Sequence, residues 1–196
     1  PTLASEELLA REGIKISREK LRQLMRGYGI EYERRRESGR VHQWRERKHH
    51  KGEMIQIDGS EHDWLEGRGP EMVLMGYIDD ATSEIFGRFY EYEGTYPAMD
   101  SFKRYIEKNG IPAQVYIDRH STYLTTRKAN IDEELRGKEA ETQFARALTE
   151  LRVKIIYAGS PQAKGRSERS FNTLQDRLIK KMRLDNVRTI EGANRY

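Results

Sequence analysis

The sequence predicts an α/β fold in which a mixed five-stranded sheet is flanked by helices and preceded by a small all-α segment. Two observations lead to this prediction. After residue 53, short stretches with strand character come first as a group of three and then alternate with helical patterns. Three strands joined by turns and followed by βαβ-like units are typical of a mixed sheet covered by helices. The first 30 residues show only helical spacing.

Composition excludes several classes of protein. The 196 residues include no cysteine, which excludes disulfides, cysteine-type zinc sites, iron–sulfur clusters and thiol catalysis. A chain without cysteine is compatible with a reducing compartment such as the cytoplasm. No apolar run approaches the roughly 18 residues that a transmembrane helix needs, so we expect no membrane-spanning segment.

Charge is unevenly placed along the chain. Residues 1–51 contain 14 Lys and Arg against 8 Asp and Glu, and residues 164–188 contain 8 against 3. Two basic blocks therefore flank a more acidic middle, a distribution that attracts polyanions such as nucleic acid. Solvated helix faces would give the same counts, so charge alone leaves both interpretations open.

The first 30 residues predict two short helices, the first over residues 5–11. Gly13 and Ile14 break the pattern, and Ser17 can cap the second helix through its hydroxyl. The apolar face of the second helix is expected to carry Leu21, Leu24 and Met25, and Gly27 and Gly29 end it.

Two short helices with a glycine-bearing turn outline a helix-turn-helix, although a plain helical hairpin has the same pattern. The second helix of such a motif enters the DNA groove. The predicted DNA contacts there are Arg18, Lys20, Arg22 and Arg26. We assign residues 1–30 to this segment and 31–52 to a basic linker. Residues 53–196 form the expected core. Because the chain does not begin with methionine, we expect the segment to be incomplete.

The core sequence predicts five strands and three helices. The expected strands are residues 54–58, 71–78, 84–91, 113–117 and 153–157, and the expected helices are residues 95–109, 139–151 and 163–184. Apolar residues at helical spacing support the helices. The core-facing residues predicted for the first two helices are Met99, Phe102 and Ile106, followed by Phe144, Leu148 and Leu151.

Two aspartates stand at or near strand ends. Alternation places Ile55 and Ile57 on one face of the first strand and Gln56 and Asp58 on the other. A carboxylate in a core strand is costly to bury without a partner. Asp118 follows an apolar strand, at the carboxyl edge where open α/β sheets bind ligands. Either aspartate alone could simply cap a turn.

The third carboxylate, Glu168, lies on the last predicted helix. At about 100° per residue, this helix has an apolar stripe and a mainly basic face, and Glu168 lies at the border between them. The stripe consists of Phe171, Leu174, Leu178 and Met182, and the other face carries Arg169, Lys180 and Arg183 with Asp176.

Three carboxylates in a chain without cysteine suit a hard cation such as Mg²⁺. Two such ions can activate water and stabilise the leaving oxygen of a phosphodiester.

Four motifs follow one another along the chain. They are Gln56-Ile57-Asp58-Gly59-Ser60 with His62-Asp63-Trp64, the stretch 77–83, Tyr116-Ile117-Asp118-Arg119-His120, and the stretch 161–168 with its Pro-x3-Gly-x2-Glu pattern. With these motifs the chain resembles bacterial insertion-sequence transposases that carry a retroviral-integrase-type Asp-Asp-Glu catalytic core, and it is similar to the ISNCY-like group. The resemblance covers residue 54 to about 185, and residues 2–30 resemble the family's helix-turn-helix.

The resemblance implies an RNase H-like fold in which Asp58, Asp118 and Glu168 are catalytic and hold two Mg²⁺ or Mn²⁺ ions. It implies metal-dependent hydrolysis at transposon ends and strand transfer into target DNA. The implied partners are double-stranded DNA, with terminal inverted repeats and a target, and further copies of the chain on that DNA. The implied location is the bacterial cytoplasm, at the nucleoid. The predicted DNA contacts of the core are Lys164, Arg166, Arg169 and Asn172.

The sequence departs from the integrase pattern in two places. The separation of 50 residues between Asp118 and Glu168 is longer than integrases have, with the excess expected in residues 120–138. Asn172 and Gln175 stand where integrases carry Lys.

Two alternatives stay open: a DNA-binding regulator with an inactive integrase-like core, and an RNase H-like structure-specific nuclease. The three intact carboxylates favour catalysis.

Three further residues are expected to have structural roles. Asp79 and Asp80 lie in a turn-rich stretch between two strands and are expected to shape that turn. Trp64 is expected to pack in the core rather than to stack on a base.

Overall fold

The computed structural model describes residues 1–30, 46–118, 122–123, 141–158 and 165–196, with side chains in the last range described from residue 169 onward. The chain divides into two compact units, Pro1–Val41 and His42–Tyr196. Within the described ranges, no helix is both long enough and apolar enough to cross a membrane.

The first unit contains the two short helices that the sequence predicts, α1 (Thr2–Glu12) and α2 (Arg18–Gly27). Gly13 ends α1 in the left-handed conformation, at φ 67°. The Ser17 hydroxyl caps α2 by accepting a hydrogen bond from the Lys20 amide at 3.2 Å. Neither helix contains a buried residue, so this helix pair has no core of its own within the described residues.

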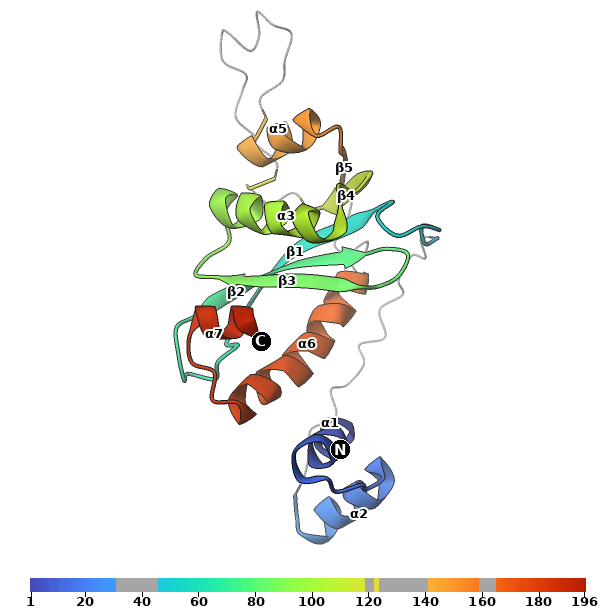
Figure 1. Ribbon diagram of the computed structural model, residues 1–196, viewed down its shortest axis with the longest axis vertical. Helices are drawn as coiled ribbons and strands as arrows, with labels where there is room; N and C mark the ends of the chain where they lie inside the picture. Colours follow the sequence, from blue (N-terminus) through green and yellow to red (C-terminus); the bar gives the residue numbers. More distant parts are fainter. Residues whose placement is uncertain (31–45, 119–121, 124–140, 159–164) are drawn as a thin grey trace, which may run out of the picture. The chain divides into compact units, whose positions relative to one another are not determined.

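The second unit is a mixed sheet of five strands with helices on both faces (Figure 1). The strands are β1 (Ile55–His62), β2 (Met72–Asp79), β3 (Ile85–Tyr90), β4 (Gln114–Ile117) and β5 (Lys154–Tyr157), in the order β3-β2-β1-β4-β5. The helices are α3 (Thr95–Asn109), α5 (Gln143–Glu150), α6 (Gly165–Leu184) and α7 (Ile190–Arg195). β1, β2 and β3 are antiparallel, whereas β4 and β5 run parallel to β1. The predicted mixed five-stranded sheet is confirmed.

Alternation along the strands separates two apolar clusters. Ile55 and Ile57 of β1 face the cluster formed with α3 and α5, which includes the buried residues Phe102 and Phe144. The opposite face carries a second cluster formed with α6 and α7. Figure 1 shows α3 and α6 on opposite sides of the strands. The sheet therefore separates two packed layers, and the polar residues of β1 lie on the α6 side.

Two predicted core residues are exposed. Met99 is 38% exposed and Leu151 is 37% exposed. Helix α3 instead turns Phe102 and Tyr105 toward the sheet, where their rings stack with Tyr77 at centroid distances of 6.3 and 5.3 Å. Helix α5 ends at Glu150, so residue 151 lies outside the helical face that covers the core.

The sequence also misplaced one strand end and missed one helix. β1 continues four residues beyond the predicted end at Asp58, to His62, because it pairs with β2 along its whole length, from Ile55 with Asp79 to His62 with Met72. The short helix α7 was not expected. Its Asn194 side chain forms two hydrogen bonds with the backbone of Phe89 on the outer strand β3, at 2.8 and 2.9 Å.

The expected apolar stripe of α6 is confirmed. Phe171 and Met182 are buried, and Leu174 and Leu178 pack against the same cluster. Trp64 is 1% exposed and belongs to this cluster as well. Its indole nitrogen donates a hydrogen bond to the Ser60 carbonyl at 3.0 Å, so its expected packing role is confirmed.

Asp79 holds the turn after β2, as expected, whereas the Asp80 side chain bonds to residues outside the turn. The Asp79 carboxylate accepts hydrogen bonds from the amides of Ala81 and Thr82 at 3.1 and 2.8 Å. The buried Asp80 carboxylate accepts from the Lys48 amide at 2.9 Å and from Gln56 Nε2 at 3.1 Å. Both carboxylates are therefore used by the fold.

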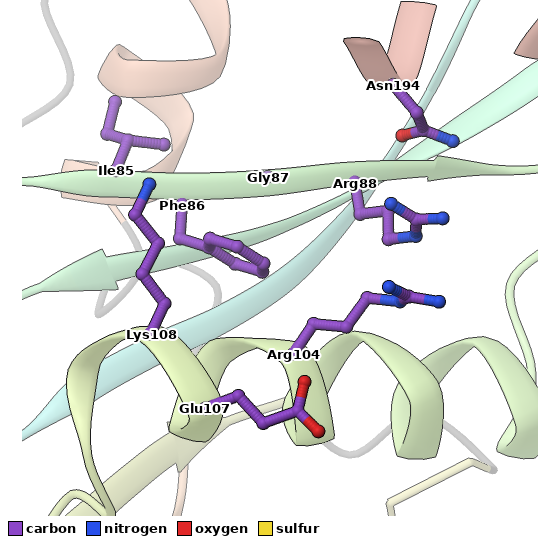
Figure 2. Close-up of a pocket in the computed structure, with 8 residues that line it drawn as sticks. All are labelled: Ile85, Phe86, Gly87, Arg88, Arg104, Glu107, Lys108 and Asn194. Carbon is purple, nitrogen blue, oxygen red and sulfur yellow. The ribbon is translucent and has the colours of Figure 1, made fainter. Parts of the chain in front are cut away.

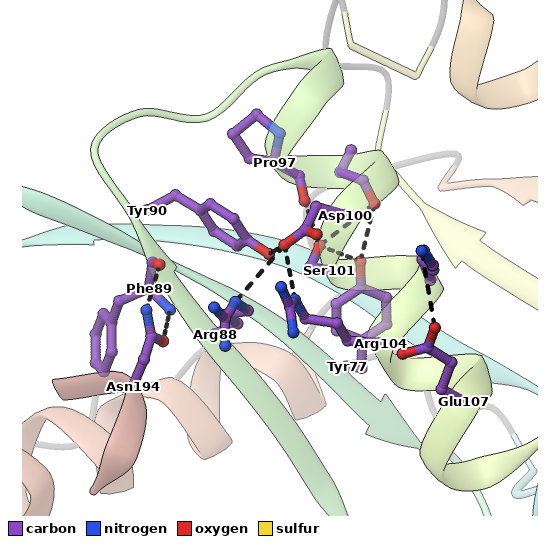
Figure 3. A network of polar contacts seen from close by, with 12 residues as sticks. Tyr77, Arg88, Phe89, Tyr90, Pro97, Asp100, Ser101, Arg104, Glu107 and Asn194 are labelled. Carbon is purple, nitrogen blue, oxygen red and sulfur yellow. Dashed lines mark hydrogen bonds and ion pairs between the residues drawn. The ribbon is translucent and has the colours of Figure 1, made fainter. Parts of the chain in front are cut away.

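A polar network fastens α3 to the outer strand β3 (Figure 3). The Asp100 carboxylate accepts hydrogen bonds from the Tyr90 hydroxyl at 2.7 Å and from Arg104 Nε at 2.9 Å, with Arg88 Nε at 3.6 Å. Burial by itself would raise the pKa of Asp100. The hydrogen bonds from Tyr90 and Arg104 and the charges of both arginines outweigh burial and lower this pKa.

We predict that Asp100→Asn lowers the free energy of unfolding by about 1–3 kcal/mol at pH 7, because it weakens hydrogen bonds to a charged group. Urea unfolding measures the change. A carboxyl whose pKa is lower in the folded state stabilises above its unfolded pKa of about 3.9 and loses that contribution as the pH falls through the folded pKa. The difference between the two proteins should therefore shrink below about pH 4. Asp176→Asn, which removes only an exposed ion pair with Lys180, is the control and should change stability little.

Candidate active site

The parallel pairing of β1 with β4 bears on where Asp58 and Asp118 lie. The register pairs Ile55 with Val115 and Gln56 with Tyr116. If the register continued for two more residues, Asp118 would lie beside Asp58 at the spacing of about 4.8 Å that separates paired strands. Both aspartates are half-buried. This register would bring two carboxylates that are 60 residues apart in the sequence close together at the carboxyl end of β4.

Helix α6 packs close to Asp58 on the same face of the sheet. Gly76 is the cross-strand partner of Asp58, and a β-carbon at residue 76 would lie 2.7 Å from the Phe171 ring. Farther along β1, Gln175 Nε2 donates a hydrogen bond to the Ser60 hydroxyl at 3.2 Å. These two contacts fix how α6 runs over β1.

Glu168 lies on α6 three residues before Phe171, about 4.5 Å upstream along the helix axis. This places its backbone near the level of Asp58. The side chain of Glu168 lies outside the described residues, so its convergence with the two aspartates stays a prediction. Within the described part of the chain, no group of three or more Asp, Glu, His or Cys residues is arranged to hold a metal ion.

Negatively charged side chains raise the pKa of the buried residue Tyr123. Tyr123 is 1% exposed, and its backbone carbonyl accepts a hydrogen bond from the Tyr157 hydroxyl at 3.1 Å. Burial raises the pKa of Tyr123 strongly, and the charges of Glu93, Asp118 and Asp58 raise it further. Its phenol therefore stays neutral at physiological pH.

The contact between Glu93 and Gly59 is not indicated by the sequence. A β-carbon at residue 59 would collide with the Glu93 carboxylate, so the carboxylate fills the space that glycine leaves behind β1. Glu93 stands in the short connection between β3 and α3. No sequence signal indicates its position, because the contact with β1 exists only once the sheet has formed.

The predicted DNA-contact residues lie on two helices. On α2, Arg18, Lys20 and Arg26 are exposed, whereas Arg22 forms an ion pair with Glu19 at 3.0 Å. On α6, Arg169 and Asn172 are exposed. Lys164, the side chain of Arg166 and the stretch 124–138 lie outside the described residues. These assignments stay predictions.

A groove of about 530 Å³ between β3 and α3 is lined by Arg88, Arg104 and Lys108, among others (Figure 2). It lies at the outer strand of the sheet, and β2 separates that strand from β1. Arg88 and Arg104 both pair with Asp100. Since the groove contains neither Asp58 nor Asp118, it is not part of the candidate active site.

Comparison with known proteins finds relatives for the whole chain. No family model matches it. The protein named "Putative transposase y4bF" from Sinorhizobium fredii is 41% identical over 197 residues, which cover 100% of this chain and 42% of that protein. The transposase for insertion sequence IS1202 from Streptococcus pneumoniae is 33% identical over 161 residues, covering 80% of this chain and 33% of that protein. The chain thus spans less than half the length of both relatives.

Solved structures show the fold. The integrase catalytic core of HTLV-2 in complex with magnesium, in its dimeric form, has a TM-score of 0.56 at 14% identity, covering 74% of this chain and 82% of that one. The catalytic core of BIV integrase has a TM-score of 0.53 at 13% identity, covering 72% and 78%. The predicted RNase H-like integrase-core fold is confirmed.

We predict that Gly76→Ala destabilises the protein by about 1–3 kcal/mol, because the added methyl group would overpack against the Phe171 ring. Replacing Phe171 by Leu in the same chain should recover part of this loss, since the two residues are in contact and their effects are not additive. A double-mutant cycle in urea measures the coupling. Equal destabilisation by Gly76→Ala in both backgrounds would contradict the close approach of α6.

Proposed function

We propose that the chain catalyses phosphodiester hydrolysis at transposon ends and transfers those ends into target DNA. The proposal is supported by similarity to a putative transposase along the whole chain, by similarity to the IS1202 transposase over 80% of it, and by the integrase-core fold. The observation that carries the proposal is the β1–β4 register, which pairs Ile55 with Val115 and Gln56 with Tyr116. Extended by two residues, this register would bring Asp118 beside Asp58. The relatives extend well beyond this chain, so the activity of the whole protein is part of the proposal.

The carboxylates of Asp58 and Asp118 suit a divalent cation. Asp58 and Asp118 offer hard oxygen ligands and are only half-buried, so both a cation and a DNA backbone can approach them. With Glu168 they would hold two Mg²⁺ or Mn²⁺ ions. Such a pair of ions would activate a water and stabilise the leaving oxygen of the phosphodiester. The HTLV-2 core, whose structure is a complex with magnesium, supports this choice of metal.

Each carboxylate is positioned by a different element. Asp58 lies within β1, which is held between β2 and β4. Asp118 follows the last residue of β4, and Glu168 lies on α6, which Phe171 fixes against Gly76. Side chains on packed strands and helices keep their geometry better than side chains on loops. This arrangement suits chemistry that depends on positioning.

DNA binding is proposed for both units. The helix pair α1–α2 would recognise the terminal inverted repeats, with Arg18, Lys20, Arg22 and Arg26 on its second helix. Near Glu168, cationic and polar side chains would contact the DNA backbone; these are Lys164, Arg166, Arg169 and Asn172. The active form is proposed to be an assembly of several copies on DNA, at the nucleoid of the bacterial cytoplasm.

We predict that Asp118→Asn abolishes Mg²⁺-dependent nicking and strand transfer on DNA that carries the element's own ends, because one ligand charge is lost without loss of volume. Thermal unfolding should stay close to that of the unsubstituted chain. The matched control is Asp176→Asn, which removes the same charge from an exposed position on α6 and should keep activity.

Other outcomes of this experiment identify other functions. Full activity of Asp118→Asn would overturn the assignment. If the unsubstituted chain binds the ends but never cleaves them with metal, the protein is a DNA-binding regulator. If it prefers branched or hybrid substrates to the ends, it is a structure-specific nuclease.

We predict that Lys164→Gln and Arg169→Gln each reduce the slope of log K against log salt for DNA binding by about one, because each removes one phosphate contact. Lys103→Gln is the control, since Lys103 is 72% exposed on α3, on the other face of the sheet. Fluorescence anisotropy between 50 and 200 mM salt measures the slope. Over this range, a protein with about six to ten phosphate contacts loses roughly a thousandfold or more in affinity. An unchanged slope removes that residue from the interface.

A further inference from the structure

Gly59 and Glu93 occupy one space behind the candidate active site. The residue after Asp58 lacks a side chain, and the Glu93 carboxylate lies where that side chain would begin. Gly59 does not have the positive φ that would itself favour glycine. Space, rather than backbone conformation, is therefore the reason for glycine at this position. The carboxylate reaches β1 from the opposite face to Asp58.

The field of Glu93 overlaps with the fields of the two aspartates. Among the charges that raise the pKa of Tyr123, that of Glu93 has the largest effect, followed by those of Tyr77, Asp118 and Asp58. The pKa of this one buried phenol is therefore raised by all three carboxylates. Glu93 is half-buried, and opposite charges interact more strongly where water is partly excluded.

We propose that Glu93 is a positioning residue that strengthens divalent-cation binding at Asp58 and Asp118 through its charge, from behind β1 and without contacting the cation. This inference rests on the proposed function. Carboxylates gathered at one site repel one another in the absence of a cation, and a bound cation relieves that repulsion. Gly59 contributes by letting the third charge approach as closely as the strand allows.

The test is a titration of the 196-residue chain with Mn²⁺, followed by the electron paramagnetic resonance signal of free Mn²⁺. Glu93→Gln keeps the shape of the side chain and removes its charge, and it should weaken Mn²⁺ binding about tenfold, the lower end of the usual cost of losing a group that surrounds metal ligands. Glu91→Gln is the matched control: it removes the same charge two residues away, from an exposed side chain, and should leave the affinity unchanged.

Kinetics separate this role from a purely structural one. With Glu93→Gln, the Mn²⁺ concentration that gives half-maximal nicking should rise by the same factor as the dissociation constant, whereas kcat at saturating Mn²⁺ stays the same. A lower kcat at saturating Mn²⁺, together with a lower melting temperature in EDTA, would mean that Glu93 only supports the fold, and would overturn the proposal.

Gly59→Ala tests the geometry directly. In the unsubstituted chain the added methyl group displaces the Glu93 carboxylate, so it should weaken Mn²⁺ binding. In a chain that already carries Glu93→Ala, the space is empty, and Gly59→Ala should change the affinity no further. Equal effects of Gly59→Ala in both backgrounds would overturn the proposal.

Asp58→Asn distinguishes failure of this inference from failure of the proposed function. If Asp58→Asn abolishes Mn²⁺ binding but folded Glu93→Gln binds normally, only the role of Glu93 is wrong. If Asp58→Asn and Asp118→Asn also bind Mn²⁺ normally, the metal-dependent function fails, and the inference fails with it.

Discussion

The parallel pairing of β1 with β4 is the constraint on which the candidate site depends. β1 pairs with β2 over its full length, from Ile55 to His62, but its register with β4 covers Ile55 and Gln56. β4 ends at Ile117, so the chain leaves the ladder at Asp118, beside the middle of β1. Because β4 is shorter than β1, Asp58 lies within a strand, whereas Asp118 follows the last residue of β4.

Negatively charged side chains lie between two apolar layers in this part of the sheet. Asp58, Asp118 and Glu93 each raise the pKa of the buried Tyr123. The cluster containing Ile57 and Phe144 covers one face, and the cluster containing Phe171 covers the other. The proposed site therefore concentrates charge between two packed apolar layers, and active sites commonly carry such a cost in stability.

Most elements were predictable because local pattern decides them. Helix α3 has the predicted bounds, 95–109, since its spacing and the glycine after it are local signals. The end of β1 was not predictable, because Asp58, Gly59, Ser60 and Glu61 carry no apolar alternation and only pairing with β2 extends the strand. Sequence motifs indicated Asp58, Asp118 and Glu168 as a site. Glu93 and Gly76 act through contacts between distant segments, which no local pattern encodes.

Docking of α6 links the chemistry to the stability of the fold. The helix is held by Phe171 over Gly76 and by Gln175 on Ser60, and Glu168 lies one turn upstream of the first contact. A cation that binds Glu168 together with the two aspartates would bind only when α6 is docked. By mass action such a cation stabilises the docked state. The same packing that positions the third carboxylate would then be strengthened by the ion that the carboxylates hold.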